Sequence, residues 1–342
     1  MADITKIVLR KPYLLLVGDE QDPHYTKTGL GIVHWRREAV AGQLRFSDAA
    51  VDLGVPDLDL ESAVANGVGS LIIGVATIGG KVPDSWTAVM YEAAAAGIDI
   101  VSGMHTKLAD DPAMVAAAKT SGARLVDVRT PPKNLPVGTG KKRSGMRILT
   151  VGTDCAIGKK YTALALDAAL REAGMNSTYR ATGQTGIIIA GEGMPIDAVV
   201  ADFVSGAAEV LSPANKPDHW DVIEGQGSLF HPGYAAVSMG LLHGSQPDGF
   251  VVCHDAVRKA VDGWEHFPLP ELDETIDLHQ RVARRTNPLT RCVGISVNTS
   301  ALPTDLRASY LETLREKHGV PAVDPLIDGC ADVVAFIRKT LA

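Results

Sequence analysis

A phosphate-binding loop is the stretch of this sequence with the clearest chemistry. Residues 151–162, VGTDCAIGKKYT, follow a short β-type run at 146–150 and open a helical run. A P-loop has this order of strand, loop and helix, in which main-chain N–H groups and a helix N-terminus converge on one anion. Lys159 can reach the bound phosphates, whereas a turn that binds nothing is the alternative. The residues expected to hold a cofactor are Gly152, Thr153, Asp154, Cys155, Ala156, Ile157, Gly158, Lys159, Lys160, Tyr161 and Thr162.

The loop departs from the usual Walker A pattern. Five residues instead of four separate Gly152 from Gly158, and Lys160 stands where a magnesium-binding Ser or Thr is usual. A second cation near the loop can neutralise phosphate charge in place of a metal ion, which argues against ATP cleavage. Thr162 is the hydroxyl that could still reach a metal, so magnesium binding stays open. The histidines lack the close helical spacing of a protein metal site, and we predict none.

Two candidate catalytic side chains lie at the end of the predicted strand 221–224 and shortly after it. In DVIEGQGSL, Glu224 lies at the end of a strand, where an acid faces the phosphate loop and can act as a base or bind magnesium; the alternative is a cap of the next turn. His231, in LFHPGY, has an ordinary pKa of about 6.5 that suits proton transfer near neutrality, but a histidine with apolar neighbours is more often a hydrogen-bonded core residue. With Lys159, these residues form the expected catalytic set.

The turn RATGQTG, residues 180–186, is the expected substrate-recognition element. Arg180 can pair bidentately with a carboxylate or phosphate, and the polar residues after it add donors, although a surface loop with satisfied polar groups is the alternative. Asp202 falls in a predicted helix with Val199, Val200 and Phe203 on its core face, where it either holds a ligand amine or is solvated. The expected substrate-binding residues are Arg180, Thr182, Gln184, Thr185, Asp202, Gln226 and Ser228.

Cys155 is the cysteine that lies in the predicted phosphate loop, where it could be reactive. A helix N-terminus beside it favours the thiolate, which makes an acyl-cysteine conceivable, and a small buried filler is the alternative that we favour from sequence. Cys155, Cys253, Cys292 and Cys330 show no metal-type spacing, and a chain of 342 residues needs no disulfides, so we expect a reducing cytoplasm.

Composition sets the outer limits. The net charge of −7 argues against a nucleic-acid binder, and no stretch has the ~20 apolar residues of a membrane span or the form of a signal peptide. We therefore expect small-molecule substrates and no nucleic-acid or membrane partner. A homo-oligomer is the base-rate expectation.

The elements that position these residues alternate along the chain. This alternation predicts an α/β protein with two doubly wound domains: a Rossmann-like domain at 1–130, a proline- and glycine-rich linker at 131–145 and a P-loop NTPase-like domain at 146–342. The basic residues 141–143 in the linker could contact a phosphate, but we expect them to be solvated. The predicted strands are 12–17, 39–46, 70–76, 99–102, 124–128, 177–181, 221–224, 249–254, 291–297 and 322–326. The predicted helices are 83–96, 111–121, 160–172, 197–211, 272–285, 305–317 and 330–341.

The motifs carry a family resemblance. GTDCAIGKK with the later EGQGS resembles the dethiobiotin synthetase branch of P-loop proteins. From end to end, through KTGLGIVHW, SGMHTKL, VDVRTPP, TGQTGIIIAGEG, VIEGQGSLFHPGY and LLHGSQPD, the chain is similar to a bacterial and archaeal P-loop family that includes D-glutamate N-acetyltransferase. The resemblance implies acetyl transfer from acetyl-CoA to the amine of D-glutamate in D-glutamate catabolism, with acetyl-CoA as co-substrate.

That chemistry needs a base, for which we assign Glu224, and a group that stabilises an oxyanion, for which we assign Lys159 or loop N–H groups. His231 is the reserve base or the proton donor to the departing thiolate. The first alternative is an ATP- and magnesium-dependent ligase or kinase acting on a small carboxylate or amine. The second is a nucleotide-responsive binding protein without turnover.

Overall fold

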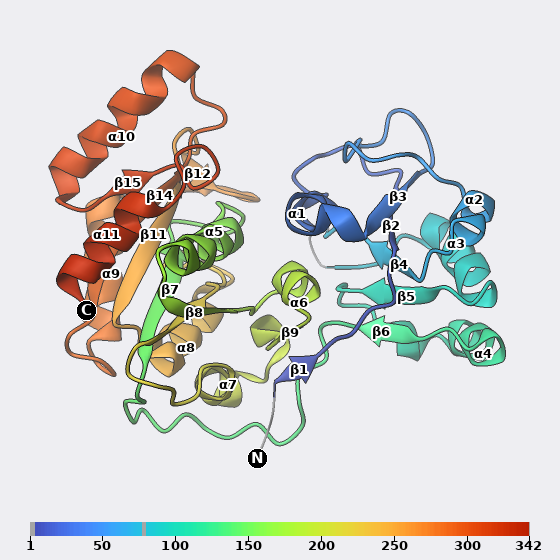
Figure 1. Cartoon of the computed structure of the whole chain (residues 1–342), viewed down its shortest axis with the longest axis horizontal. Helices are drawn as coiled ribbons and strands as arrows, with labels where there is room; N and C mark the ends of the chain where they lie inside the picture. The colour runs from blue at the N-terminus through green and yellow to red at the C-terminus, as the bar shows by residue number, and fades with distance from the viewer. Residues whose placement is uncertain (1–3, 77–79, 342) are drawn as a thin grey trace. The chain divides into compact units, whose positions relative to one another are not determined.

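A computed structural model describes residues 4–76 and 80–341 of the chain (Figure 1). The chain forms two compact units. The N-terminal unit consists of Thr5–Thr130 and Gln184–Pro195, and the C-terminal unit contains Pro131–Gly183 and Ile196–Ala342. The excursion Gln184–Pro195 was not predicted, because its sequence continues a turn that reads as part of the P-loop domain.

The N-terminal unit is built on a five-stranded parallel sheet in the order β3-β2-β4-β5-β6. This is the flavodoxin-like order of doubly wound folds. The strands are β2 (Tyr13–Gly18), β3 (Val40–Arg45), β4 (Ser70–Ile73), β5 (Asp99–Ser102) and β6 (Leu125–Asp127). The helices are α1 (Lys27–Arg36), η1 (Arg37–Ala39), α2 (Leu60–Ala65), α3 (Asp84–Ala95), η2 (Leu108–Asp110) and α4 (Pro112–Ser121).

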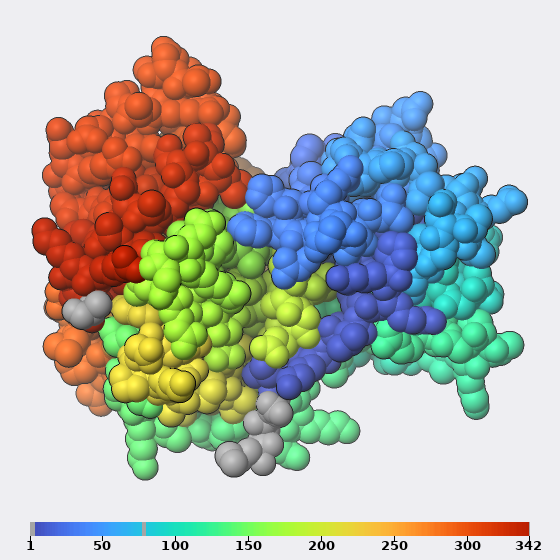
Figure 2. All heavy atoms as spheres, in the orientation of Figure 1, coloured from blue at the N-terminus to red at the C-terminus, as the bar shows by residue number. Residues whose placement is uncertain are grey.

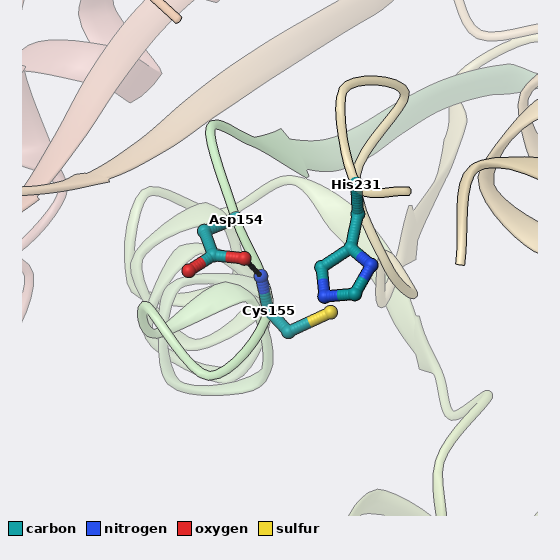
Figure 3. A group of neighbouring side chains, drawn as sticks. All are labelled: Asp154, Cys155 and His231. Atoms are coloured by element: carbon teal, nitrogen blue, oxygen red, sulfur yellow. Dashed lines mark hydrogen bonds between the residues drawn. The ribbon is translucent and has the colours of Figure 1, made fainter. Parts of the chain in front are cut away.

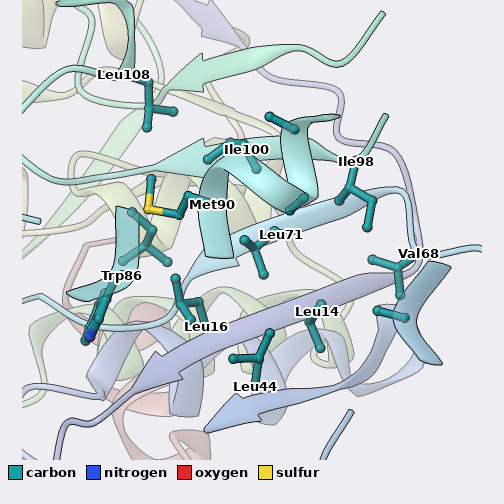
Figure 4. Packing of buried hydrophobic residues seen from close by; sticks show 14 of the residues in the cluster. Leu14, Leu16, Leu44, Val68, Leu71, Trp86, Met90, Ile98, Ile100 and Leu108 are labelled. Carbon is teal, nitrogen blue, oxygen red and sulfur yellow. The ribbon is translucent and has the colours of Figure 1, made fainter. Parts of the chain in front are cut away.

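The core of the N-terminal unit explains why these runs become strands and helices. All six residues of β2 are buried, as are all four of β4 and of β5, which is typical of parallel strands covered on both faces. Figure 4 shows Leu14, Leu71 and Ile100 from these strands packing with Met90 of α3. Helix α4 begins at a proline behind the capping side chain of Asp111, whose carboxylate accepts from the main-chain N–H groups of Ala113 and Met114.

The excursion adds two further elements to this unit. They are α6 (Gln184–Ala190) and β9 (Glu192–Gly193), which pairs antiparallel with β1 (Thr5–Lys6). Helix α6 packs on α1, and Arg36 Nε donates to the carbonyl of Ile189 at 3.0 Å.

The C-terminal unit is built on a six-stranded parallel sheet in the order β15-β14-β11-β7-β10-β8. Its strands are β7 (Met146–Gly152), β8 (Asn176–Arg180), β10 (His219–Ile223), β11 (Gly249–Asp255), β14 (Arg291–Asn298) and β15 (Ala322–Val323). A separate hairpin joins β12 (Ala260–Val261) to β13 (Trp264–Pro268).

The helices of this unit form two layers. Helix α5 packs on α11, whereas α8 packs on both α7 and α9. In the space-filling view, α10 and α11, coloured orange to red, form much of the visible surface of this unit (Figure 2). The helical elements are α5 (Lys159–Glu172), η3 (Ile196–Ala198), η4 (Ala201–Phe203), α7 (Val204–Leu211), α8 (Ala235–Ser245), α9 (Leu272–Ala283), α10 (Thr304–His318) and α11 (Ala331–Thr340).

The register of β7 and β10 positions the site. Trp220 lies opposite Met146 and Ile223 opposite Leu149, and the two strands run in the same direction. Their carboxyl ends therefore meet at one edge of the sheet, where β7 runs into the phosphate loop and β10 runs into Glu224. The predicted α/β class, with a parallel sheet in each of two units, is confirmed.

Several local predictions were wrong. The predicted helix 197–211 is broken: two short 3-10 turns come first, and only its second half is the helix α7. Val200, which we predicted to face the core, is exposed. The predicted strand 322–326 is only Ala322–Val323, and the predictions lacked α1, α2, α6, α8 and the hairpin. Residues 141–143 are not all solvated, because Lys142 Nζ donates to Asp248 at 2.7 Å and Arg143 Nε to the carbonyl of Ser212 at 2.7 Å. Among the described residues, no helix combines the length and apolar character needed to cross a membrane.

Candidate active site

The loop between β7 and α5 has the backbone form of an anion cradle. Ala156 has a φ of 50° and Gly158 a φ of 105°, so the chain turns through left-handed conformations before α5 begins at Lys159. A Cβ at Gly152 would lie 2.6 Å from Ile157 Cδ1 and 3.1 Å from the carbonyl of Cys253. A side chain where β7 ends would force Ile157 to shift and crowd the carbonyl of Cys253, so glycine suits this position. The first main-chain N–H groups of α5 are available to an anion.

Asp154 holds the loop in place from inside. Its buried carboxylate accepts from Cys155 N at 2.6 Å through one oxygen. The other oxygen accepts from Asp262 N at 2.9 Å and from Arg258 Nη1 at 3.0 Å. Asp154 is thus bound by protein groups on both oxygens, which favours a structural role over the cofactor contact expected from the sequence.

The cations of the loop differ in their surroundings. Lys159 is only 7% exposed, and its Nζ donates to the carbonyl of Asp154 at 2.6 Å, so its ammonium lies against the loop backbone. Lys160 is less buried, and its Nζ lies 4.8 Å from the centroid of the Tyr161 ring. Lys160 also lowers the pKa of Glu224 by its charge, so the second cation acts on the acid at the end of β10.

The hydroxyl of Thr162 does not have the setting expected of a metal ligand. It donates to the carbonyl of Gly158 at 3.0 Å and shares a 2.7 Å hydrogen bond with Ser296 of β14. The hydroxyl therefore faces the buried side of α5, with 2% of the residue exposed. Thr153, also buried, pairs with His254 Nδ1 at 3.3 Å.

Glu224 is the most strongly positioned carboxylate at the strand ends. One of its oxygens accepts from the Tyr179 hydroxyl at 2.9 Å, from Thr182 N at 2.9 Å and from Gly183 N at 3.1 Å. Burial raises the pKa of Glu224, and the two main-chain hydrogen bonds, the charge of Lys160 and the Tyr179 hydroxyl act in the opposite direction. The residue is 4% exposed, so it has the environment of a tuned base.

The glycine after Glu224 allows this close approach. A Cβ at Gly225 would lie 1.8 Å from the carbonyl of Thr150 and 3.1 Å from Lys159 Cδ, so β7 and the turn after β10 touch at this point. Gly225 N in turn donates to the Thr150 hydroxyl at 2.9 Å.

Polar side chains predicted to bind substrate surround Glu224 in part. The Thr182 hydroxyl donates to the carbonyl of Glu224 at 2.7 Å, and Gln226 Nε2 donates to Thr182 Oγ1 at 3.0 Å. The buried Ser228 hydroxyl donates to the carbonyl of Thr153 at 3.1 Å and so ties this turn to the phosphate loop. Thr182, Gln226 and Ser228 therefore belong to one hydrogen-bonded cluster.

The other predicted substrate residues lie elsewhere. Arg180 Nε donates to buried Asp221 at 2.8 Å, which makes it an ion-pair partner inside the sheet. Gln184 and Thr185 begin α6 of the N-terminal unit, where the Thr185 hydroxyl bonds that of Thr28 at 2.9 Å. Asp202 lies in a 3-10 turn of the C-terminal unit and is exposed. Their contacts with a substrate stay predictions.

His231 is held in one protonation form. Its Nδ1 accepts from Gly233 N at 3.0 Å and from Tyr234 N at 3.2 Å, so the proton of the neutral ring is on Nε2. The ring packs against Tyr234 and Trp264 with centroids 4.5 and 4.7 Å away, and burial lowers its pKa. A ring fixed in this way can donate a hydrogen bond from Nε2–H, whereas accepting or giving up a proton would require a different protonation form. The roles of reserve base and of proton donor to the thiolate therefore stay predictions.

Asp154, Cys155 and His231 form a cluster, with one ligand-type atom from each within 4.8 Å of the others (Figure 3). The donor set resembles a metal site in composition. The chemistry does not fit a cation, because Asp154 is paired with Arg258 and the Nε2 lone pair of His231 is taken by a proton. Cys155 is partly exposed, so it is not the buried filler that the sequence favoured.

Sequence reasoning missed three residues that shape this site: Tyr179, Arg258 and Trp264. Tyr179 lies in β8, and the sequence does not reveal that β8 pairs with β10, the strand that leads to Glu224. The other two follow β11, where no motif marks them, and Arg258 reaches Asp154 across 104 residues. Only the end-of-strand position of Tyr179, next to Arg180, offered a sequence signal.

The comparisons agree along the whole chain. Residues 136–334 match a domain of unknown function described as the DUF1611 P-loop domain, and residues 44–131 match its Rossmann-like N-terminal domain. The protein named D-glutamate N-acetyltransferase from Tritonibacter scottomollicae is 45% identical over 96% of this chain and 98% of its own. One of the same name from a Pseudoalteromonas species is 43% identical over the same shares.

A solved structure supports the same assignment. The crystal structure of a DUF1611 family protein from Anabaena variabilis has a TM-score of 0.89 and 32% identity, and covers 96% of this chain and 100% of that one. The sequence matches and the structural likeness extend over both units, and the chain belongs to the DUF1611 family.

Proposed function

We propose that this protein is an N-acetyltransferase that moves the acetyl group of acetyl-CoA to the amino group of D-glutamate. The observation that carries the proposal is 45% identity over 96% of the chain to a protein named D-glutamate N-acetyltransferase. Identity at this level over both units supports the same reaction class.

The phosphate loop fits the phosphates of coenzyme A. The left-handed turn at Ala156 and Gly158 and the N-terminus of α5 form the cradle, and Lys159 and Lys160 supply positive charge. Acetyl-CoA brings an acetyl group activated as a thioester. Because its phosphates are not cleaved, the loop needs no metal ligand at the position of Lys160, and the inward-facing hydroxyl of Thr162 is consistent with this.

Glu224 is the base in this proposal. The ammonium of D-glutamate must lose a proton before its nitrogen can attack a carbonyl, and a carboxylate whose pKa is raised is a better acceptor near neutrality. Burial raises the pKa of Glu224 in this way. Thr182 and Gln226 lie beside it and offer hydroxyl and amide groups for the substrate.

The oxyanion formed during acyl transfer needs donors that are already oriented. His231 presents Nε2–H from a ring that two main-chain N–H groups and two aromatic side chains hold in place. A neutral imidazole in this form can donate a hydrogen bond to developing negative charge. Lys159 adds the positive charge of its ammonium at the loop. We therefore assign stabilisation of the oxyanion to His231 and Lys159.

The direct test is a thiol-release assay. The purified protein is mixed with acetyl-CoA and D-glutamate, free thiol is followed, and N-acetyl-D-glutamate is identified by chromatography. L-glutamate and D-aspartate serve as matched acceptors for handedness and chain length. A rate with D-glutamate no higher than the rate without acceptor would refute the proposal.

The competing function is an ATP- and magnesium-dependent ligase or kinase, which a P-loop by itself favours. Lys160 at the position of the metal-binding hydroxyl and the inward hydroxyl of Thr162 count against it. ADP release that depends on a small carboxylate or amine, and that a chelator abolishes, would support the competitor. We expect neither, because acetyl transfer consumes no nucleotide.

The acetyl donor bears on where in the cell the protein acts. The use of acetyl-CoA as the acetyl donor supports a cytoplasmic location, which we propose on that basis. A homo-oligomer stays a prediction that sedimentation would test.

A further inference from the structure

Cys155 and His231 meet at the phosphate loop although 76 positions separate them in the sequence. Cys155 comes from the loop between β7 and α5, and His231 from the turn between β10 and α8. Figure 3 shows the His231 ring with its edge toward the Cys155 sulfur, and the ligand-type atoms of both lie within 4.8 Å. A cysteine beside a histidine is an arrangement used for covalent catalysis.

The imidazole is oriented to donate toward this point. Nδ1 is occupied by Gly233 N and Tyr234 N, so Nε2 carries the proton. Nε2 is buried and has no hydrogen-bond partner within residues 4–76 and 80–341, and the residue is 1% exposed. A buried N–H without an acceptor is unfavourable, which indicates that an acceptor reaches it from the ligand or as a thiolate.

The surroundings of Cys155 favour negative charge on sulfur. It precedes the N-terminus of α5, and the Arg258 guanidinium donates to its carbonyl at 2.9 Å. The negative charge of Asp154 is balanced by the same guanidinium. The other cysteines are unsuited to this role, because burial raises the pKa of Cys253 to about 11 and that of Cys292 and Cys330 to about 12.

We propose that Cys155 carries the acetyl group as a thioester intermediate and that His231 Nε2–H stabilises the thiolate and the oxyanion; the proposal rests on the acetyltransferase function above. In the first half, the Cys155 thiolate attacks the acetyl carbonyl, its new C–S bond replaces that of acetyl-CoA, and coenzyme A leaves with the proton that Cys155 lost. In the second half, Glu224 accepts one proton from the ammonium of D-glutamate, and the neutral amine attacks the thioester. The C–N bond forms, the C–S bond to Cys155 breaks, and the second proton lost by the nitrogen returns to the Cys155 sulfur.

The order of events distinguishes this route from direct transfer. With acetyl-CoA and no acceptor, the wild-type protein should release one equivalent of thiol and gain the mass of one acetyl group on the peptide containing Cys155. Adding D-glutamate should remove that mass and yield N-acetyl-D-glutamate. Double-reciprocal plots at several acceptor concentrations should be parallel.

Variants assign the roles. Cys155→Ala should lose both the acetylated peptide and turnover, whereas Cys330→Ala, at the buried cysteine that precedes α11, should keep both. His231→Ala should slow the thiol burst roughly 100-fold, the loss typical of one oxyanion donor, and His231→Gln should recover part of it by restoring an N–H donor. Equal melting temperatures for these two histidine variants would show that the difference lies in chemistry and not in folding.

Three results would overturn the proposal. The first is full turnover by Cys155→Ala with no acetyl group on the wild-type peptide; this would leave the acetyltransferase function intact and show direct transfer. The second is intersecting double-reciprocal lines with no thiol burst. The third is one equivalent of zinc in the purified protein that Cys155→Ala loses. Failure of the acetyltransferase function itself looks different, since the wild-type protein would then form no N-acetyl-D-glutamate.

Discussion

The hydroxyl of Tyr179 donates a hydrogen bond to the carboxylate of Glu224 at 2.9 Å, from β8 across to the end of the adjacent strand β10. The contact is fully buried, and burial raises the pKa of Tyr179 so far that its hydroxyl stays protonated as a donor. This donor favours the ionised form of Glu224, and so it opposes the burial that raises the pKa of the carboxyl.

Removing this hydroxyl should therefore move the pH dependence of the reaction. A base works only when deprotonated, so kcat/KM should fall as the pH drops through the pKa of Glu224, which lies above the ordinary carboxyl range. In Tyr179→Phe the pKa of Glu224 should rise further, so the fall of kcat/KM on the acidic side of the pH profile (the acidic limb) should move to higher pH. The pH–rate profile measures this, with Tyr310→Phe in α10 as the matched control. A limb that stays in place would show that Glu224 is not the titrating base.

The base itself can be tested by an isosteric change. Glu224→Gln keeps the size of the side chain but removes the proton acceptor, so kcat should fall roughly 10²- to 10⁴-fold. Binding of coenzyme A, followed by calorimetry, should change little, because the phosphate loop is untouched. Glu265→Gln replaces an exposed glutamate of β13 in the same unit and should keep full activity. A Glu224→Gln variant with wild-type turnover would assign the proton transfer to another group.

Lys160 should act on both the cofactor and the base. Its charge lowers the pKa of Glu224, so Lys160→Met should move the acidic limb to higher pH, as Tyr179→Phe does. It should also raise KM for acetyl-CoA by about tenfold or more, since a hydrogen bond between charged groups contributes about 1.5–3 kcal/mol. Lys141→Met, at an exposed lysine, is the control for lost charge. If the acidic limb shifts but KM for acetyl-CoA does not change, Lys160 acts only on the pKa of Glu224 and does not bind the cofactor.

The parts of the site that the sequence predicted are those fixed by chain direction. A strand that runs into Gly152 and another that runs into Glu224 must end at the same edge of a parallel sheet, so the loop and the acid were found from the pattern of apolar runs. The same pattern predicted the Rossmann-like unit from its short buried strands.

The missed parts depend on partners distant in the sequence. An arginine after a strand has the same local pattern whether it clamps a substrate or pairs with Asp221, which is 41 residues away. The tautomer of His231 follows from two main-chain N–H groups that face it only once the turn has folded. Likewise, nothing local in Gln184–Pro195 indicates that it packs with α1 and β1.

The ion pair of Arg180 with Asp221 leads to a prediction about stability. Asp221 is 1% exposed and also bonds the Ser212 hydroxyl at 2.6 Å, so its charge is held inside the sheet by neighbours that include Arg180. Arg180→Met should leave this carboxylate without its guanidinium partner and lower the free energy of unfolding by about 3 kcal/mol. Arg281→Met, at the exposed i,i+4 pair with Asp277, should cost less than about 1 kcal/mol.

The same variant decides whether Arg180 also binds substrate. If Arg180 serves only Asp221, KM for D-glutamate measured below the melting temperature should stay within about twofold of the wild-type value, because the ordinary loss of a guanidinium–carboxylate contact is about 1.5–3 kcal/mol or more than tenfold. Denaturant unfolding and steady-state kinetics on one preparation give both quantities. A large rise in KM with unchanged stability would reverse the assignment and restore the carboxylate clamp that its position after β8 predicts.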